Sequence, residues 1–183
     1  MTRLSDLLRT LAPAWRRVIA PRRAGAAAPK ARRGATSELI SPGRTGPTAT
    51  VQVDPRRVGP VRTSYAPVTD GDPDPGEVVW TWVPFEEHDG RGKDRPVLVV
   101  AAEPAGSVLA VQLTSRDHDG DPDFVAVGSG GWDSEGRPSW VNLSRVLRVF
   151  PAGMRRESIG LERIAFDKVV HRLDAWYGWD RTP

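Results

Sequence analysis

The sequence predicts a mainly β protein, in which short strands form a small barrel or sandwich that one C-terminal helix closes. Two observations predict this fold class. From residue 76 onward, stretches rich in β-branched and aromatic residues follow one another without an intervening helical pattern, each bounded by Gly, Pro or Asp. Near the C-terminus, the apolar residues change from alternation to the three- and four-residue spacing of a helix.

Five successive strands are predicted. The first, "GEVVWTWVP" (76–84), alternates along a run of β-formers. The other four are "RPVLVVAAE" (95–103), "GSVLAVQLTS" (106–115), "DFVAVGS" (123–129) and "PSWVNLSRVLRVF" (138–150). The helix is predicted within "ESIGLERIAFDKVVHRLDAWYGW" (157–179), with Ser158 as a candidate N-cap and Gly178 as its C-cap glycine. Residues 76–183 therefore form the predicted domain.

The positive charge of the chain lies before this domain. Residues 1–70 hold 13 Lys and Arg against 4 Asp and Glu, whereas residues 71–183 hold 13 against 19. The net charge of +3 therefore does not by itself indicate a nucleic-acid-binding domain. Residues 21–75 are rich in Pro, Gly and Arg, and they are predicted to be a disordered basic linker because they hold few large apolar residues.

Residues 1–20 show the spacing of an amphipathic helix, with arginines on its polar side. Such a helix could lie on an anionic membrane surface or dock into a partner, and the alternative is a short helix that packs on its own domain or frays. The chain has no cysteine, which excludes disulfides and thiolate metal sites. It has neither a membrane-spanning apolar run nor a secretion signal, so we expect a cytoplasmic protein.

The usual catalytic motifs are absent from the sequence: it contains no glycine-rich phosphate loop and no paired histidines that could bind a metal. The acidic stretch 117–123 has alternating carboxylates, but it lacks the Glu of an EF-hand loop, so a hairpin loop is favoured over a calcium site. The sequence therefore offers no motif for a metal or for a phosphate-bearing cofactor.

Arg95 stands before Pro96 at the predicted start of a strand, and the pair Thr114 and Ser115 ends the next strand. Pro96 favours an extended backbone at Arg95, so a hydroxyl of the neighbouring strand could lie beside the guanidinium. Together they would offer a phosphodiester a cation and a hydrogen-bond partner. Alternatives remain open. Arg95 could pair with a carboxylate at position 86, 87, 89 or 94, and Thr114 could face solvent.

In their order and spacing, "GEVVWTWVPFEEHDGRGKDRPVLVV", "LAVQLTSRD", "WVNLSRVLRV" and the closing helix resemble the MazF/PemK family of toxin–antitoxin endoribonucleases. The resemblance covers about residues 76–179. It implies an SH3-like β-barrel that forms a homodimer and cleaves single-stranded RNA without a metal or cofactor, with an antitoxin protein as partner. It also implies that Arg95 and Thr114 are the catalytic pair. The alternative is a non-catalytic nucleic-acid-binding or protein-interaction module on the same fold.

The residues expected to bind the RNA are Arg91, Lys93, Ser115, Trp132 and Arg145. Trp132 belongs to this set because the glycine-rich stretch "GSGGWDSEG" is not expected to bury it, so it could stack on a base or dock an antitoxin. Where many relatives have an Asp-Gln pair, Ser144 and Arg145 align, so contacts made by that pair are expected to differ here.

Overall fold

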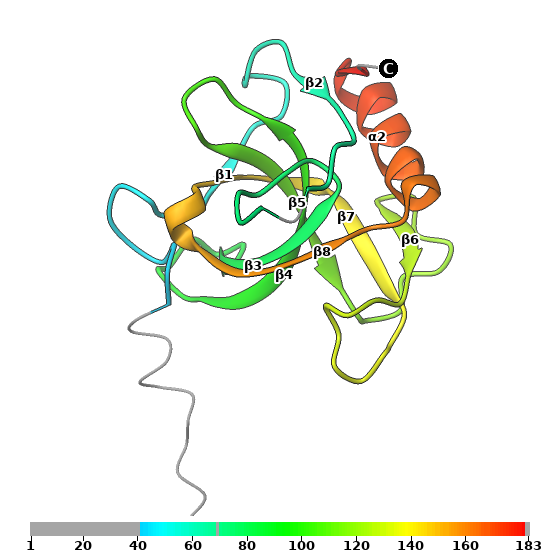
Figure 1. Ribbon diagram of the computed structural model, residues 1–183, viewed down its shortest axis with the longest axis horizontal. Helices are drawn as coiled ribbons and strands as arrows, with labels where there is room; N and C mark the ends of the chain where they lie inside the picture. The colour runs from blue at the N-terminus through cyan, green and yellow to red at the C-terminus, as the bar shows by residue number, and fades with distance from the viewer. Residues whose placement is uncertain (1–40, 69, 182–183) are drawn as a thin grey trace, which may run out of the picture. The chain divides into compact units, whose positions relative to one another are not determined.

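The computed structural model describes residues 41–68 and 70–181. The helix predicted over residues 1–20 and the first part of the predicted linker lie outside the described residues. Within them, the mainly β fold with a C-terminal helix is confirmed (Figure 1). The five predicted strands are present as β3 (Glu77–Pro84), β4 (Gly92–Ala102), β5 (Val108–Thr114), β6 (Phe124–Gly128) and β7 (Ser139–Val149).

Two further strands complete the main sheet: β1 (Val51–Val53) and β8 (Met154–Gly160). The antiparallel order is β1-β7-β5-β4-β3-β8, and β6 pairs with the other part of β7. The pairings of β4 with β5 and of β5 with β7 each contain a register shift. Such bulges bend strands and increase their twist, which allows this small sheet to curve strongly.

Both faces of the curved sheet are buried, because neighbouring residues of β4 point into two separate clusters. Val97 and Val99 pack in an aliphatic cluster with residues of β3, β5 and β7 and with Met154. Leu98 and Val100 pack in the larger cluster, which also contains side chains of the helix. Burial on both faces explains why β4 reads as an unbroken apolar run after Pro96.

The helix α2 (Arg163–Tyr177) buries Phe166, Val169, Val170 and Leu173 on the larger cluster. Gly178 ends it in the left-handed conformation with φ 69°, and its N–H donates to Asp174 O, as predicted. Ser158 as N-cap is wrong, because it lies in β8, which pairs with β3, and the N-cap is Glu162. A short 3-10 turn, η1 (Pro151–Gly153), connects β7 to β8.

The prediction of a linker up to residue 75 is wrong from Ser41 onward. Residues 41–68, which we call the N-terminal arm, pack on the domain. β1 pairs with β7, and β2 (Arg62–Thr63) pairs in parallel with β9 (Asp180–Arg181), which follows α2. Tyr65 donates from its hydroxyl to Leu161 O at 2.8 Å, and its ring centroid lies 5.2 Å from that of Phe166. A few such anchors order a segment whose composition is otherwise that of a linker.

The arm also connects β1 to the opposite end of the sheet. Thr50 directly precedes β1, and its Oγ1 lies 2.9 Å from Thr81 Oγ1 of β3. Gly43 packs against Gly153, so closely that a Cβ on Gly43 would stand 2.7 Å from Gly153 O. The arm thus bridges β7 at one end of the sheet and β3 with η1 at the other.

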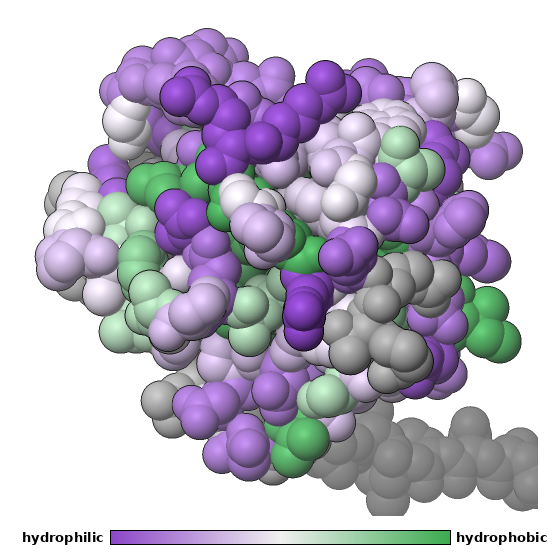
Figure 2. All heavy atoms as spheres, turned by 90° about the horizontal axis from the view of Figure 1, so that it is seen from above, coloured by the Kyte–Doolittle hydropathy of each residue, from purple (hydrophilic) through white to green (hydrophobic). Residues whose placement is uncertain are grey.

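The surface is mainly polar. In the view of Figure 2, hydrophilic side chains predominate and apolar ones form small groups between them. Among the described residues, the exposed large hydrophobic side chains are Val51, Val68 and Ile164. No helix in this part of the chain has the length and apolar character needed to cross a membrane.

Candidate active site

The candidate site lies where β4 and β5 separate. The last residues to pair at this end of the two strands are Val97 of β4 and Gln112 of β5. Arg95 and Thr114 each lie two residues beyond that pair, so strand alternation places them on the same face, opposite each other across the gap. A pocket of about 160 Å³ opens there, and both residues line it. The structure therefore brings together the two residues predicted to be the catalytic pair.

Arg95 lies inside β4 and not at its start, because β4 begins at Gly92 and pairs with β3 from there. Among the described residues, none pairs with the edge of β4 that faces β5 before Val97. Pro96, which has no N–H, is tolerated at such an edge. The part of β4 that holds Arg95 is thus anchored on one side and open to the pocket on the other.

The alternative that Arg95 serves an ion pair is not supported within the described part of the chain. Asp89 pairs with Arg91 at 2.6 Å, and Asp94 pairs with Arg155 at 3.4 Å. Glu86 and Glu87 are exposed, and no described carboxylate lies within ion-pair distance of the Arg95 guanidinium. Its N–H donors therefore remain available to an anion in the pocket.

Thr114 is partly buried, and its Oγ1 accepts a hydrogen bond from the N–H of Arg116 at 3.1 Å. A hydroxyl can accept twice and donate once, so this contact holds the oxygen in place and leaves its hydrogen to donate. Among residues 41–68 and 70–181, no acceptor takes that hydrogen. Lys93 and Ser115 also line the pocket, both exposed, so two of the predicted RNA-binding residues join the catalytic pair.

The expectation that Trp132 is left unburied is wrong. Its side chain is 6% exposed and belongs to the larger core cluster, and its Nε1 donates to Ser139 Oγ at 3.1 Å. The ring folds back over its own loop, where a Cβ on Gly130 would collide with it at 2.2 Å. The glycines therefore make room for the ring instead of exposing it. Trp132 lines the pocket as part of its wall.

A second pocket, of about 370 Å³, shares Arg95 with the first. It contains the two remaining predicted residues, Arg91 and Arg145, so the structure divides the predicted site between adjoining pockets. Arg91 is exposed, and its guanidinium carbon lies 5.9 Å from the centroid of the Phe85 ring. Gln112, which the sequence interpretation missed, also lines this pocket.

Arg145 is held inside the protein. It is 7% exposed, and it donates to Gln52 Oε1 at 3.1 Å, Gln112 Oε1 at 3.2 Å and Pro84 O at 2.8 Å. Burial lowers its pKa from the ordinary arginine range; a carboxylate at position 86 opposes this shift and the charge of Arg95 adds to it. With these donors directed at protein oxygens, direct contact of Arg145 with RNA stays a prediction.

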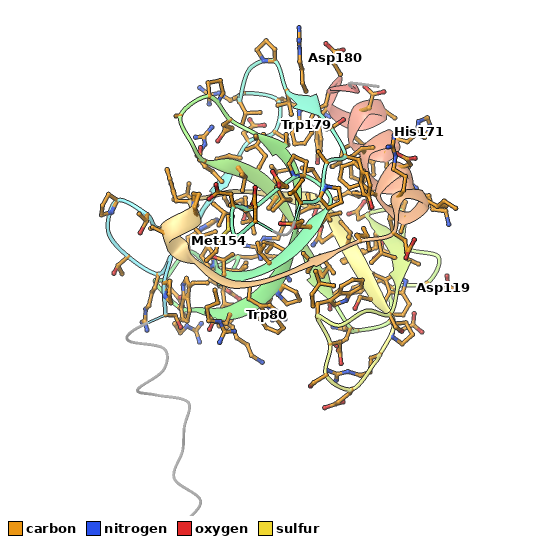
Figure 3. The ribbon with its side chains drawn as sticks, viewed as in Figure 1. Trp80, Asp119, Met154, His171, Trp179 and Asp180 are labelled. Atoms are coloured by element: carbon orange, nitrogen blue, oxygen red, sulfur yellow. The ribbon has the colours of Figure 1, made fainter. Side chains whose placement is uncertain are left out.

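The wall of the first pocket includes further residues that the sequence interpretation missed. Trp80 lies in the lower part of the view in Figure 3, well apart from His171 of α2, and the guanidinium carbon of Arg155 stands 5.4 Å from the centroid of its ring. Asp94 accepts from Ser41 Oγ at 3.3 Å through Oδ2, whereas its Oδ1 is buried without a partner among the described residues. Arg155 could not be found from sequence because β8 was not predicted.

The acidic stretch 117–123 forms the connection between β5 and β6, as predicted for a loop. Asp117 and Asp121 each accept a backbone N–H two residues ahead, and His118 stacks on Phe124 at 3.6 Å. None of its carboxylates lines either pocket. The described residues contain no group of three or more acidic or histidine side chains that could hold a metal ion.

Comparison with known proteins gives the same family as the sequence motifs. Residues 74–177, more than half of the chain, match the family model described as a PemK-like, MazF-like toxin of type II toxin–antitoxin systems. No curated protein matches the chain. The N-terminal arm lies before the matched region.

Similar solved structures include MazE-MazF (Form-III) from Deinococcus radiodurans, 23% identical, which covers 60% of this chain and 99% of that chain with a TM-score of 0.44. An endoribonuclease from a mycobacterial species is 18% identical; the match covers 59% of this chain and 93% of that chain, with a TM-score of 0.42. The Mycobacterium tuberculosis toxin MazF-mt6 is 17% identical; the match covers 56% of this chain and 98% of that chain, with a TM-score of 0.39. With the family model matching over the whole of β3 to α2, this chain belongs to the PemK/MazF-like toxin family.

Proposed function

We propose that this protein is the toxin of a type II toxin–antitoxin system, acting in the cytoplasm as an endoribonuclease that cleaves single-stranded RNA without a metal ion. One observation carries the proposal. In a chain of this family, Arg95 and Thr114 face one pocket across the gap between β4 and β5, each with donors that no described side chain takes.

In the proposed reaction, the 2′-OH of a nucleotide attacks its own 3′-phosphorus, and the P–O5′ bond breaks. The 2′-OH loses its proton and the departing 5′-oxygen gains one, so the products are a 2′,3′-cyclic phosphate and a 5′-OH end. Arg95 would stabilise the negative charge that develops on the phosphate oxygens, and the Thr114 hydroxyl would donate to one of them. Lys93 and Ser115, on the two sides of the pocket, would bind the flanking backbone.

The test uses the purified full chain with a long single-stranded RNA in EDTA, with the cut ends mapped by sequencing. We expect discrete cuts with 5′-OH ends, and a loss of roughly 10³-fold or more in rate for Arg95→Ala. Arg116→Ala is the matched control, because it removes an exposed arginine near Thr114 that lines neither pocket. RNA binding without cuts by the folded protein would instead indicate a non-catalytic binding module.

The family description supports an antitoxin as partner. We propose that the toxin is a homodimer. We also propose that an antitoxin segment occupies the first pocket, between Arg95 and Thr114, and so excludes RNA. Expression should therefore arrest growth, the substitution Arg95→Ala should relieve the arrest, and light scattering should give twice the mass of the chain. A catalytically active monomer would contradict the dimer and leave the nuclease proposal intact.

A further inference from the structure

Gln112 shares a pocket with Arg95 and contacts the buried Arg145. It precedes Thr114 by two residues on β5, so both side chains lie on the same face as Arg95. It lines the second pocket together with Arg95, and it is the partner of the buried Arg145.

Arg145 fixes the orientation of the Gln112 amide. A guanidinium has donors only, so the oxygen of the amide must face it, and Nη1 of Arg145 donates to Gln112 Oε1 at 3.2 Å. The amide NH₂ must then point away from Arg145. Its nitrogen is neither hydrogen-bonded to another described residue nor among the buried atoms that lack a partner. It is thus an open donor.

Arg145 itself has little freedom to turn. Its Nε donates to Gln52 Oε1 in β1, and its Nη2 donates to Pro84 O at the end of β3. Three separate strands thereby hold one buried guanidinium, and through it the direction of one amide. The arm is part of this arrangement, because Gln52 belongs to it.

We propose that Gln112 is a substrate-binding residue: its NH₂ group donates to a phosphate oxygen of RNA held beside Arg95, and Arg145 is the positioning residue that orients it. This inference rests on the proposed function. The sequence predicts that Arg145 binds RNA directly; in this inference Gln112 makes the contact and Arg145 only orients it. A neutral donor here adds phosphate binding without placing a third exposed cation next to Arg95.

The test compares Gln112→Glu with Asn142→Asp in the full-length protein. A glutamate at position 112 can still accept from Arg145, and an aspartate at position 142 can still accept from the N–H and Oγ of Ser144, so each variant should melt close to the temperature of the parent. A glutamate at position 112 would turn an oxygen towards the phosphate, whereas the carboxylate at position 142 would lie outside both pockets. Binding is measured with a random-sequence, single-stranded 2′-O-methyl RNA, which cannot be cleaved by the proposed reaction, and cleavage is measured with unmodified RNA.

We expect Gln112→Glu to raise the Kd roughly tenfold or more, and Asn142→Asp to change it less than about twofold. Equal effects of the two substitutions, in a parent that binds and cuts RNA, would overturn the role of Gln112. A parent that neither binds nor cuts RNA would overturn the proposed function and this inference together.

The positioning role of Arg145 is tested by coupling. Arg145→Lys keeps the charge, but its single nitrogen cannot reach the three oxygens to which three separate nitrogens of Arg145 donate. It should raise KM in the parent and have little further effect in a Gln112→Met background, because Arg145 acts on RNA through Gln112. An equal rise in KM in both backgrounds would show that the effect of Arg145 does not pass through Gln112.

Discussion

The hydroxyl oxygen of Thr114 takes part in two hydrogen bonds, one observed and one proposed. It accepts the Arg116 N–H, which holds the end of β5, and in the proposed reaction it donates to phosphate. Thr114→Val keeps the shape and removes both interactions, so we expect cleavage to fall by roughly 10²–10³-fold. Thr114→Ser keeps the hydroxyl and should stay within about tenfold of the parent. Single-turnover cleavage assays check this, and equal losses in both variants would point to packing of the methyl group instead.

The residues of the site differ in how far sequence could predict them. Arg95 and Thr114 were found because Pro96 marks one strand, the Leu-Thr-Ser string marks the end of the next, and the resemblance to the family gives both residues a role. Gln112 was missed because its importance comes from Arg145, which is distant in sequence. Trp132 was misjudged because local composition does not show that a ring can fold back over its own glycines. Such contacts depend on tertiary packing, which a one-dimensional pattern does not contain.

At the scale of elements, an ion pair joins the β4–β5 turn to β7. Glu103 accepts two hydrogen bonds from Arg148, both at 2.6 Å, and one from Ser107 Oγ. The Arg148 guanidinium lowers the pKa of Glu103 below its ordinary value of 4.5, although burial opposes the shift. Its stabilising effect is therefore complete above pH 4.5, and it is lost as the pH falls through the lowered pKa.

Glu103→Gln should thus destabilise the fold by roughly 1–2 kcal/mol at pH 7, and the difference from the parent should shrink below pH 4.5. Thermal unfolding followed by circular dichroism at several pH values measures it. Glu135→Gln is the control, because the ion pair of Glu135 with Arg137 is exposed and should contribute little. A difference that persists unchanged at low pH would mean that packing, and not charge, is responsible.

The turn around Gly43, near the start of the N-terminal arm, gives a second prediction at this scale. Gly43 has φ +77°, and an added Cβ would meet Gly153 O at 2.7 Å. Gly43→Ala should destabilise the fold by about 2 kcal/mol or more. Gly46→Ala has a similar φ of +84° with open space around it, so it should show the backbone strain alone, roughly 1–2 kcal/mol. Urea unfolding compares the two, and equal losses would mean that the arm moves aside.

The strands themselves were predictable to different degrees. Five of them are five residues or longer, rich in apolar residues and bounded by turn residues, and these were found. β8 was missed because "MRRESIG" is mostly polar, and it is a strand because β3 offers it an edge. β1 and β2 have three and two residues, too few for any periodicity to be seen.

At the scale of the whole molecule, the arm belongs to the folding unit although the family match begins after it. Val61 is buried, and Trp179 donates from Nε1 to Pro55 O at 3.2 Å. A chain that begins at Ser41 keeps these contacts and is the reference for a shorter one. One that begins at Asp74 should lose several kcal/mol and tend to aggregate, since it exposes core and the edge of β7. Calorimetry and gel filtration check this; equal melting temperatures would contradict it.

The three hydrogen bonds of Arg145 predict that distant parts of the chain change together in evolution. A buried guanidinium that lost Gln52 or Gln112 would be left with unpaired donors, which is more unfavourable than having no arginine there. Relatives without the arm should therefore carry a shorter or neutral residue at the position of Arg145. Arginine at this position, glutamine at position 112 and the arm should be inherited together, so their joint presence would define a lineage within the family.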